Sequence, residues 1–321
     1  MEPIRLRREN LVDFPFCINF ELTSRCNLRC TYCPRDNMVK MKGLKIGDMD
    51  PRLFEEVVDQ GTRFADRTKV GFWPEGLGDP LMYSGLADAI KLIKKKSPDA
   101  PVGIDTNGTL LTAEQSRILC EGLAISDVLK VSLNAGTPET YARLNRVDKF
   151  NLVVQNTIEF LRIRRELRKG PRLIIQILES AITAKEIQGF KEFWAPLIDE
   201  GDTIKVKPLQ RWAGRADEDL VSVESNSERY PCLSLWISTA IDVDGNVYPC
   251  CQGYAARDPK EGLLLGNLRE KSLKTIYSGD KIKDMRGKHL NGKWDEIPEC
   301  SRCDLWYSYP NVWFKVGKRW V

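Results

Sequence analysis

Histidine is almost absent from this sequence, and its scarcity narrows the chemistry open to the protein. The 321 residues include one histidine, His289. Histidine is the side chain most often used as a general base and is the commonest metal ligand. Catalysis by a histidine base and a histidine-rich metal site are therefore almost excluded.

Long apolar runs and a strong excess of one charge are also lacking. No apolar stretch approaches the roughly 20 residues of a transmembrane helix, and the charged residues 1–10 contain no apolar core of a signal peptide. Lys and Arg (49) outnumber Asp and Glu (45) only slightly, a bias too small to indicate nucleic-acid binding. We therefore expect a cytoplasmic protein that binds neither membranes nor nucleic acids.

Strand-like and helix-like segments alternate between residues 14 and 208. The strand-like segments lie at 16–22, around residue 70, and at 101–106, 128–134, 172–180 and 203–208. Repeats of this kind predict a parallel sheet with helices as crossover connections. Because a full eightfold barrel takes about 250 residues, we expect an α/β fold with a partial (β/α)6 barrel over residues 1–214.

Three of the intervening helices have recognisable starts. Asp50 is followed by a proline, a pair typical of an N-cap and a first helical turn. Thr112 with Gln115, and Thr183 with Glu186, have the spacing of capping boxes.

The composition changes after Gly214. Residues 215–229 are polar and indicate a linker, whereas residues 230–321 are rich in cysteine and aromatic side chains. We therefore expect a small separate domain over 230–321.

Ten cysteines are present, and their grouping indicates metal binding rather than the disulfides of small secreted domains. Cys26, Cys30 and Cys33 follow the first expected strand, where β/α barrels build their active sites. Structural zinc usually has four protein ligands. Three thiolates therefore either share a zinc ion with a distant fourth ligand or hold an iron–sulfur cluster with one open iron. The position after the strand favours the cluster.

The same segment resembles the radical S-adenosylmethionine (SAM) enzymes, whose hallmark is CxxxCxφC with an aromatic residue at φ. Here the motif is Cys26, Cys30, Tyr32 and Cys33. The resemblance implies a [4Fe–4S] cluster whose open iron binds SAM, with Tyr32 beside the adenine. It also implies that the reduced cluster cleaves SAM to a 5′-deoxyadenosyl radical, which takes a hydrogen atom from a substrate. The electron would come from a partner such as flavodoxin or ferredoxin.

Further SAM contacts follow from this resemblance. The turn from Glu75 to Asp79 follows the second expected strand, where the family has GGE or GxGEP and its backbone receives the SAM amino group. Gly76, Gly78 and Asp79 are the candidates here, with Asp79 in place of the usual glutamate. Glycine turns alone are common, so position makes this assignment credible. Asn107, at the end of the third expected strand, is a further candidate.

Polar side chains alternate along the fourth expected strand. Lys130, Ser132 and Asn134 share one face by the two-residue period of a strand, and we expect this face to line the barrel. Ser132 and Asn134 are candidates for the SAM ribose or carboxylate, or alternatively polar caps of the strand end. The same argument places further polar residues inside the barrel, which suits a polar substrate: Cys17, Asn19, Glu21, Lys205 and Lys207.

A second group of cysteines lies in the C-terminal part. Cys232, Cys250, Cys300 and Cys303 can form a zinc ribbon, yet their arrangement with Gly245 and the later Gly-Asn-Leu segment resembles the SPASM/Twitch extensions of radical SAM enzymes. The resemblance implies one auxiliary [4Fe–4S] cluster on these four cysteines. With no open iron, this cluster would transfer electrons or support the structure.

Cys251 is left over beside Cys250. It could replace Cys250 as a ligand, be inert, or donate a hydrogen atom to the substrate. Neighbouring residues of an extended segment face opposite ways. The spacing from Gly245 singles out Cys250 as the ligand. We therefore expect Cys251 to point away from the cluster and to be the candidate catalytic thiol.

Together these features predict a radical SAM oxidoreductase or epimerase. The expected substrate is a small polar molecule resembling a carbohydrate or an aminocyclitol, on which both dehydrogenation and epimerisation are open. The alternatives are an enzyme that modifies a ribosomal peptide and, outside enzymes, a zinc-binding interaction protein.

Overall fold

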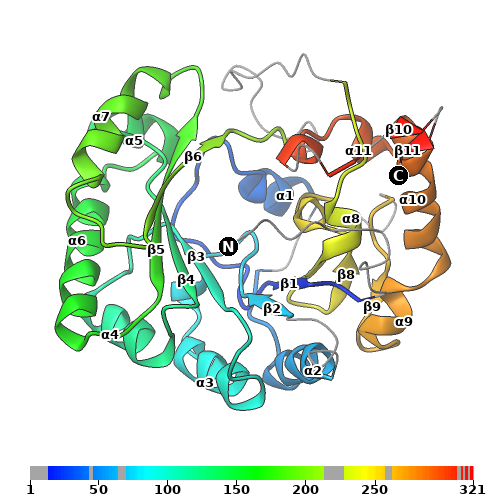
Figure 1. Cartoon of the computed structure of the whole chain (residues 1–321), viewed down its shortest axis with the longest axis horizontal. Helices are drawn as coiled ribbons and strands as arrows, with labels where there is room; N and C mark the ends of the chain where they lie inside the picture. The colour runs from blue at the N-terminus through cyan, green and yellow to red at the C-terminus, as the bar shows by residue number, and fades with distance from the viewer. Residues whose placement is uncertain are drawn as a thin grey trace.

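A curved row of parallel strands forms the centre of the molecule (Figure 1). The computed structural model describes residues 14–42, 46–63, 70–212, 228–256, 262–308, 312–313, 315–316 and 319–320. The first six strands are β1 (Cys17–Phe20), β2 (Gly71–Trp73), β3 (Gly103–Thr106), β4 (Val128–Ser132), β5 (Arg172–Glu179) and β6 (Thr203–Pro208). All six occur where the sequence predicted them.

The pairing of these strands is parallel throughout. β1 pairs with β2, and β3 to β6 pair in chain order. A parallel bridge between Phe72 and Val102 joins the two sets into one row. This confirms the predicted β/α barrel pattern.

Helices cover the outside of this row (Figure 1). The exception is α1 (Arg35–Lys42), which lies on the inner side of the curve in this view. The covering helices are α2 (Pro51–Thr62), α3 (Leu86–Lys96), α4 (Ala113–Gly122), α5 (Pro138–Asn145), α6 (Phe150–Leu167) and α7 (Ile187–Trp194). Their apolar faces pack on the strands, as Val57 and Val58 of α2 show, since both are fully buried. Burial of such side chains stabilises the fold by about 1.5–3 kcal/mol each.

Two of the predicted helix starts are confirmed, and one is wrong. The side chain of Asp50 accepts hydrogen bonds from the first turn of α2, and Thr112 accepts one from the Gln115 N–H. Thr183, however, makes no capping bond to the short 3-10 turn at 184–186 that precedes α7. Its hydroxyl donates to the Leu178 carbonyl at 2.5 Å.

Glu186, the other half of that expected capping box, is used in a tertiary contact. Its carboxylate accepts hydrogen bonds from the Gly136 N–H (2.8 Å) and the Thr137 hydroxyl (2.9 Å). It therefore fastens α7 to the segment between β4 and α5. A local sequence pattern cannot anticipate partners some 50 residues away.

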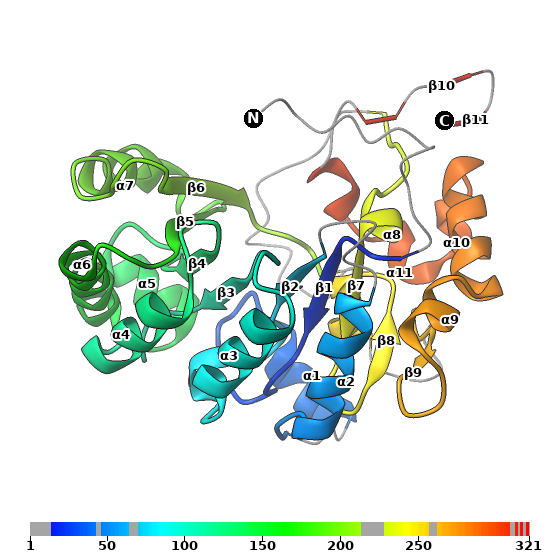
Figure 2. The ribbon, with the colours of Figure 1, turned by 60° about the horizontal axis from the view of Figure 1, so that its bottom comes forward.

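The C-terminal part continues the same sheet. It contains α8 (Ser234–Ile237), β7 (Ser238–Ile241), β8 (Asn246–Tyr248), β9 (Gly266–Asn267), α9 (Leu273–Tyr277), α10 (Asp280–Leu290), α11 (Pro298–Ser301), β10 (Lys315–Val316) and β11 (Arg319–Trp320). β7 pairs in parallel with β1, and β8 and β9 follow in antiparallel order. Figure 2 shows β7 and β8 beside β1. The expected linker 215–229 lies almost wholly outside the described residues, so the domain limits stay predictions.

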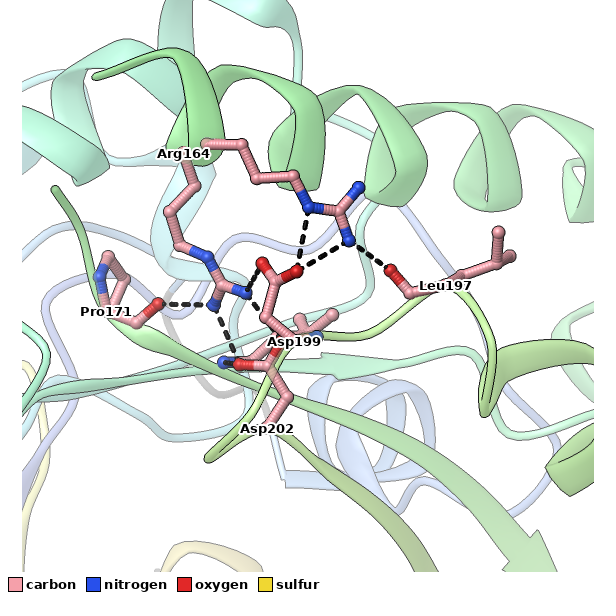
Figure 3. A network of polar contacts seen from close by, with 7 residues as sticks. Arg164, Pro171, Leu197, Asp199 and Asp202 are labelled. Atoms are coloured by element: carbon pink, nitrogen blue, oxygen red, sulfur yellow. Dashed lines mark hydrogen bonds and ion pairs between the residues drawn. The ribbon is translucent and has the colours of Figure 1, made fainter. Parts of the chain in front are cut away.

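A buried charge network fixes the far edge of the row (Figure 3). Arg164 of α6 donates to both carboxylate oxygens of Asp202, at 2.7 and 2.5 Å, and to Asp199 at 2.6 Å. Arg165 also donates to Asp199, at 2.8 Å. These bonds hold the segment between α7 and β6 against α6, so they help to set the position of β6. Removing one partner of such a buried network costs about 3–5 kcal/mol.

Candidate active site and metal centres

A cavity of about 270 Å³ lies at the carboxyl ends of the barrel strands. The residues predicted to contact SAM all line it: Tyr32, Gly76, Gly78, Asp79, Asn107, Ser132 and Asn134. So do Cys26, Cys30, Cys33 and Cys251. The structure therefore brings together residues that are up to about 225 positions apart in the sequence.

The polar face predicted for β4 lines this cavity. Lys130, Ser132 and Asn134 are among its lining residues, whereas Val131 and Leu133 are fully buried in the apolar core. Lys207 of β6 also lines the cavity.

The polar side chains expected to face the barrel interior from the first strand form hydrogen bonds within the protein instead. Asn19 donates to the Thr239 carbonyl of β7 at 2.8 Å, and Glu21 accepts from the Leu77 N–H at 2.8 Å. Neither side chain is among the lining residues of the cavity. The pairing of β7 with β1 explains the contact of Asn19 and could not be foreseen from the first strand alone.

The three N-terminal cysteines are held by backbone contacts of their loop. The Thr31 N–H donates to the Leu144 carbonyl at 2.8 Å, and the Cys33 N–H donates to the Cys30 carbonyl at 3.1 Å. Burial raises the pKa of all three thiols, that of Cys33 to about 11. Such buried sulfurs need a cationic group nearby to become thiolates.

The donor set at this position suits an iron–sulfur cluster. Cys26, Cys30 and Cys33 offer sulfur alone, and cysteine thiolates are the usual ligands of such clusters. Among the described residues, no three Cys, His, Asp or Glu side chains converge on the position of a single metal ion. Three ligands on a four-iron cluster leave one iron open for a further molecule.

Tyr32 is held at the cavity wall by a chain of amide side chains. Asn134 donates to the Tyr32 hydroxyl at 2.9 Å, and that hydroxyl donates to Asn145 at 3.1 Å. Gln176 donates to the side-chain oxygen of Asn134 at 3.0 Å. Asn134 therefore positions Tyr32. Within the described part of the chain, Ser132 receives only a long 3.5 Å contact from Gln176. Asn134 adopts the left-handed conformation with φ 62°, which asparagine tolerates better than most residues.

Sequence reasoning missed Asn145 and Gln176. Gln176 is almost fully buried, on an otherwise apolar strand with the sequence LIIQIL. A lone amide in such a strand is a signal that could have been used, because buried polar side chains are rare and usually have a specific partner. Asn145, at the end of α5, carries no comparable signal.

The turn after β2 requires glycine at two positions. A Cβ at Gly78 would lie 2.0 Å from the Thr23 carbonyl oxygen, and one at Gly76 would lie 2.7 Å from the Glu21 side chain. Any larger residue would displace this turn from the cysteine loop. The close packing explains both glycines independently of any ligand.

Asp79 fastens the same turn to its neighbours. Its N–H donates to the Arg25 carbonyl at 2.8 Å. Its carboxylate accepts from the Thr106 hydroxyl at 3.0 Å and from the Asn107 N–H at 2.8 Å. Burial raises the pKa of this carboxyl group. Asp79 thus joins the cysteine loop to the end of β3.

Opposite charges meet on another part of the cavity wall. Lys130 forms an ion pair with Asp105 and lies 4.0 Å from Glu75. Burial lowers the pKa of Lys130 to about 8, and the charges of Lys207 and Lys205 add to this effect, although Glu75 acts against it. A lysine of this kind changes its charge near neutral pH, as catalytic lysines do.

The four C-terminal cysteines line a second, smaller cavity. Cys232, Cys250, Cys300 and Cys303 share it with Arg229, His289 and Trp306, among others. Burial raises the pKa of all four thiols. Four thiols around one cavity match the ligand set of a fully coordinated iron–sulfur cluster.

Cys250 and Cys251 face different cavities. Cys250 lines the four-cysteine cavity, and Cys251 lines the barrel cavity. Cys250 has extended backbone, with φ −162° and ψ 172°, so the two side chains point in opposite directions. Burial raises the pKa of Cys251 to about 11.

Two protein-family models match the chain. The radical SAM superfamily matches residues 20–170, and the SPASM iron–sulfur cluster-binding domain matches residues 223–304. The chain belongs to the radical SAM superfamily. The two matches imply a [4Fe–4S] cluster that binds SAM and an auxiliary iron–sulfur cluster in this radical SAM protein, and they set aside the zinc-binding alternative.

Similar curated proteins cover most of this radical SAM chain. A tungsten-containing aldehyde ferredoxin oxidoreductase cofactor-modifying protein of Pyrococcus furiosus is 25% identical over 317 residues, covering 89% of this chain and 86% of that protein. The S-adenosyl-L-methionine-dependent 2-deoxy-scyllo-inosamine dehydrogenase of Niallia circulans is 23% identical over 293 residues, covering 89% and 92%.

Solved structures support the fold. SuiB of Streptococcus suis, bound to its precursor peptide SuiA, has a TM-score of 0.65 at 15% identity, covering 93% of this chain and 73% of SuiB. BtrN in complex with AdoMet and 2-DOIA has a TM-score of 0.56 at 17% identity, covering 91% and 93%. Among the described residues, every helix is too short or too polar to cross a membrane.

Proposed function

We propose that this radical SAM enzyme epimerises a small polar substrate held in the barrel cavity. The observation that carries this proposal is the position of Cys251. Its side chain lines the same cavity as Cys26, Cys30 and Cys33, while the neighbouring Cys250 belongs to the other cavity. A thiol is a good hydrogen-atom donor, and Cys251 is the thiol of this cavity that the two predicted clusters do not need.

The cofactor and the protein carry out different steps of the proposed epimerisation. With its cluster and SAM bound, the centre at Cys26, Cys30 and Cys33 supplies the radical that takes a hydrogen atom from a substrate carbon. Cys251 then returns a hydrogen atom to the other face: its S–H bond breaks and a new C–H bond forms with inverted configuration. The sulfur radical left on Cys251 takes up one electron and one proton and becomes a thiol again. We propose a flavodoxin or ferredoxin as the electron donor.

The cavity wall favours a substrate with hydroxyl or amino groups. Lys130, Asp105 and Glu75 place both charges on one side of the cavity. The Ser132 hydroxyl has one long contact with the residues that the structure describes. These groups match the alternating donors and acceptors of a carbohydrate or an aminocyclitol. The dehydrogenase from Niallia circulans, named for an aminocyclitol, supports this substrate class.

Dehydrogenation is the second candidate, and Lys130 favours it. Here a carbon that bears a hydroxyl group loses a hydrogen atom, its hydroxyl proton passes to a base, and one electron leaves to an iron–sulfur acceptor. Lys130 is a suitable base because its pKa is lowered to about 8 inside the cavity. The similarity to a dehydrogenase over most of both chains also supports this reading.

The test is a substrate screen with the anaerobically reconstituted enzyme. Aminocyclitols and sugars, 2-deoxy-scyllo-inosamine among them, are incubated with SAM and a reductant, and 5′-deoxyadenosine is quantified beside the products. The proposal expects one of them to stimulate deoxyadenosine formation and to yield a product of unchanged mass. A product two mass units lighter would establish dehydrogenation. Stimulation by a peptide alone would overturn the substrate class.

A further inference from the structure

Buried polar atoms without partners gather around the four-cysteine cavity. Among the described residues, they include Nε2 of His289, Nε of Arg229, Oε2 of Glu299 and both amide atoms of Gln252. All four of these side chains line the cavity. Leaving a buried polar group without a hydrogen-bond partner destabilises a fold. Their concentration in one place indicates that they face a polar group bound there.

His289 presents a proton donor to this cavity. Its side chain lies on α10 and only 1% of the residue is exposed. Its Nδ1 accepts a hydrogen bond from the Cys232 N–H at 3.2 Å. An accepting Nδ1 carries a lone pair, so the ring proton belongs on Nε2. That Nε2–H has no acceptor among the described residues.

Arg229 brings a positive charge to the same place. Its Nη atoms donate to the carbonyl of Cys300 and, at 3.3 Å, to that of Ser301. Its guanidinium group also lies over the rings of Trp294, at 5.1 Å, and Trp306, at 5.8 Å. The charge is thus fixed on the turn that carries Cys300, and Nε has no partner among the residues that the structure describes.

We propose that His289 and Arg229 set the reduction potential of the auxiliary iron–sulfur cluster by donating hydrogen bonds to its sulfur atoms. Reduction adds negative charge to a cluster. Donors and positive charge near its sulfurs stabilise the reduced form and raise the potential. Glu299 acts in the opposite direction, so the potential reflects the balance among the three. This inference rests on the auxiliary cluster and is independent of the substrate and of Cys251.

The proposal is tested on the full-length, anaerobically reconstituted chain by redox titration followed by electron paramagnetic resonance. The radical SAM cluster is removed by changing Cys26, Cys30 and Cys33 to Ala, so that the auxiliary signal is seen alone. His289→Phe should keep the iron content and make reduction about tenfold less favourable, which is about 59 mV for one electron. His289→Gln keeps a donor and should recover most of this change. Tyr277→Phe, which alters a buried residue outside the cavity lining, should leave the potential unchanged.

Equal potentials for His289→Phe and the parent protein, with equal iron content, would overturn the role of His289. If His289→Phe loses the cluster, the wild-type side chain is examined directly. Protein labelled with ¹⁵N-histidine should show a weak hyperfine coupling to the reduced cluster, as expected for a hydrogen-bonded nitrogen. Absence of any coupling, or the strong coupling of a nitrogen bound to iron, would contradict the proposal.

Discussion

Cys250 and Cys251 are adjacent in the chain, yet they line two different cavities. The four-cysteine cavity contains Cys250, and the barrel cavity contains Cys251. One peptide bond therefore connects a predicted ligand of the auxiliary cluster to a residue of the predicted active site. This arrangement assigns different chemistry to two identical side chains, and it leads directly to the first prediction.

Substitution of Cys250, but not of Cys251, should lower the iron content of the protein. Cys250→Ala should lose or destabilise the auxiliary cluster, because one of its four thiol ligands is missing. Cys251→Ala should keep both clusters. Iron and sulfide analysis of the anaerobically reconstituted variants measures this difference. The reverse pattern would make Cys251 the ligand and leave Cys250 as the free thiol.

Gly78→Ala should impair SAM cleavage. The added Cβ would lie 2.0 Å from the Thr23 carbonyl oxygen, so the turn must move away from the cysteine loop. A displacement of about 1 Å can lower a rate about 100-fold, and we expect a loss of that order in deoxyadenosine formation. Gly189→Ala is the control, because among the described residues no atom outside its own stretch of helix lies within 4 Å of the added Cβ. Equal rates for both variants would show that the turn does not position SAM.

Lys130 should react with acylating reagents at lower pH than ordinary lysines. Its pKa is lowered to about 8, and only the neutral amine reacts. At pH 8 about half of Lys130 should be neutral, against well under one in a hundred for a lysine of pKa about 10.4. Competitive labelling followed by mass spectrometry compares Lys130 with the exposed Lys91. Glu75→Gln should lower the midpoint of Lys130 further, since Glu75 favours the charged form. A midpoint near 10 would contradict this account of the cavity.

Arg164→Met should destabilise the barrel far more than Arg162→Met. Both arginines lie on α6, but the Arg164 side chain is 7% exposed and Arg162 is 56% exposed. Breaking the buried network should cost about 3–5 kcal/mol, whereas the exposed pairs of Arg162 contribute less than about 1 kcal/mol. The thermal unfolding midpoint of the reconstituted proteins measures the difference. Similar midpoints would mean that the network contributes little.

Local periodicity predicted the parallel strands well. The two-residue alternation of β4 placed Lys130 and Ser132 in the cavity and Val131 in the core, and the structure agrees. The spacing of Cys26, Cys30 and Cys33 predicted the first thiol group for a similar reason, because these residues lie close together in sequence. Patterns of this kind depend only on residues that are close in sequence, so they can be recognised without the structure. The second group extends over residues 232–303 and was predicted from its resemblance to the SPASM/Twitch extensions.

Contacts between distant segments were not predictable in this way. The pairing of β7 with β1 joins residues about 220 positions apart. The sequence of neither strand indicates which strand it pairs with. Glu186 has the local spacing of a capping residue, yet its carboxylate bonds Gly136 and Thr137 instead. The amide chain from Gln176 to Tyr32 likewise depends on how β5 packs beside β4. Tertiary geometry decides each of these cases.

The measurement that tests the central claim most directly is the isotope content of the product formed in heavy water. The Cys251 thiol exchanges its hydrogen with solvent, whereas the carbon-bound hydrogens of SAM do not. The wild-type product should therefore carry one deuterium at the inverted carbon. Cys251→Ala, with both clusters intact, should form deoxyadenosine but no inverted product. A product without solvent deuterium, or full turnover by Cys251→Ala, would contradict the role of this thiol and favour dehydrogenation.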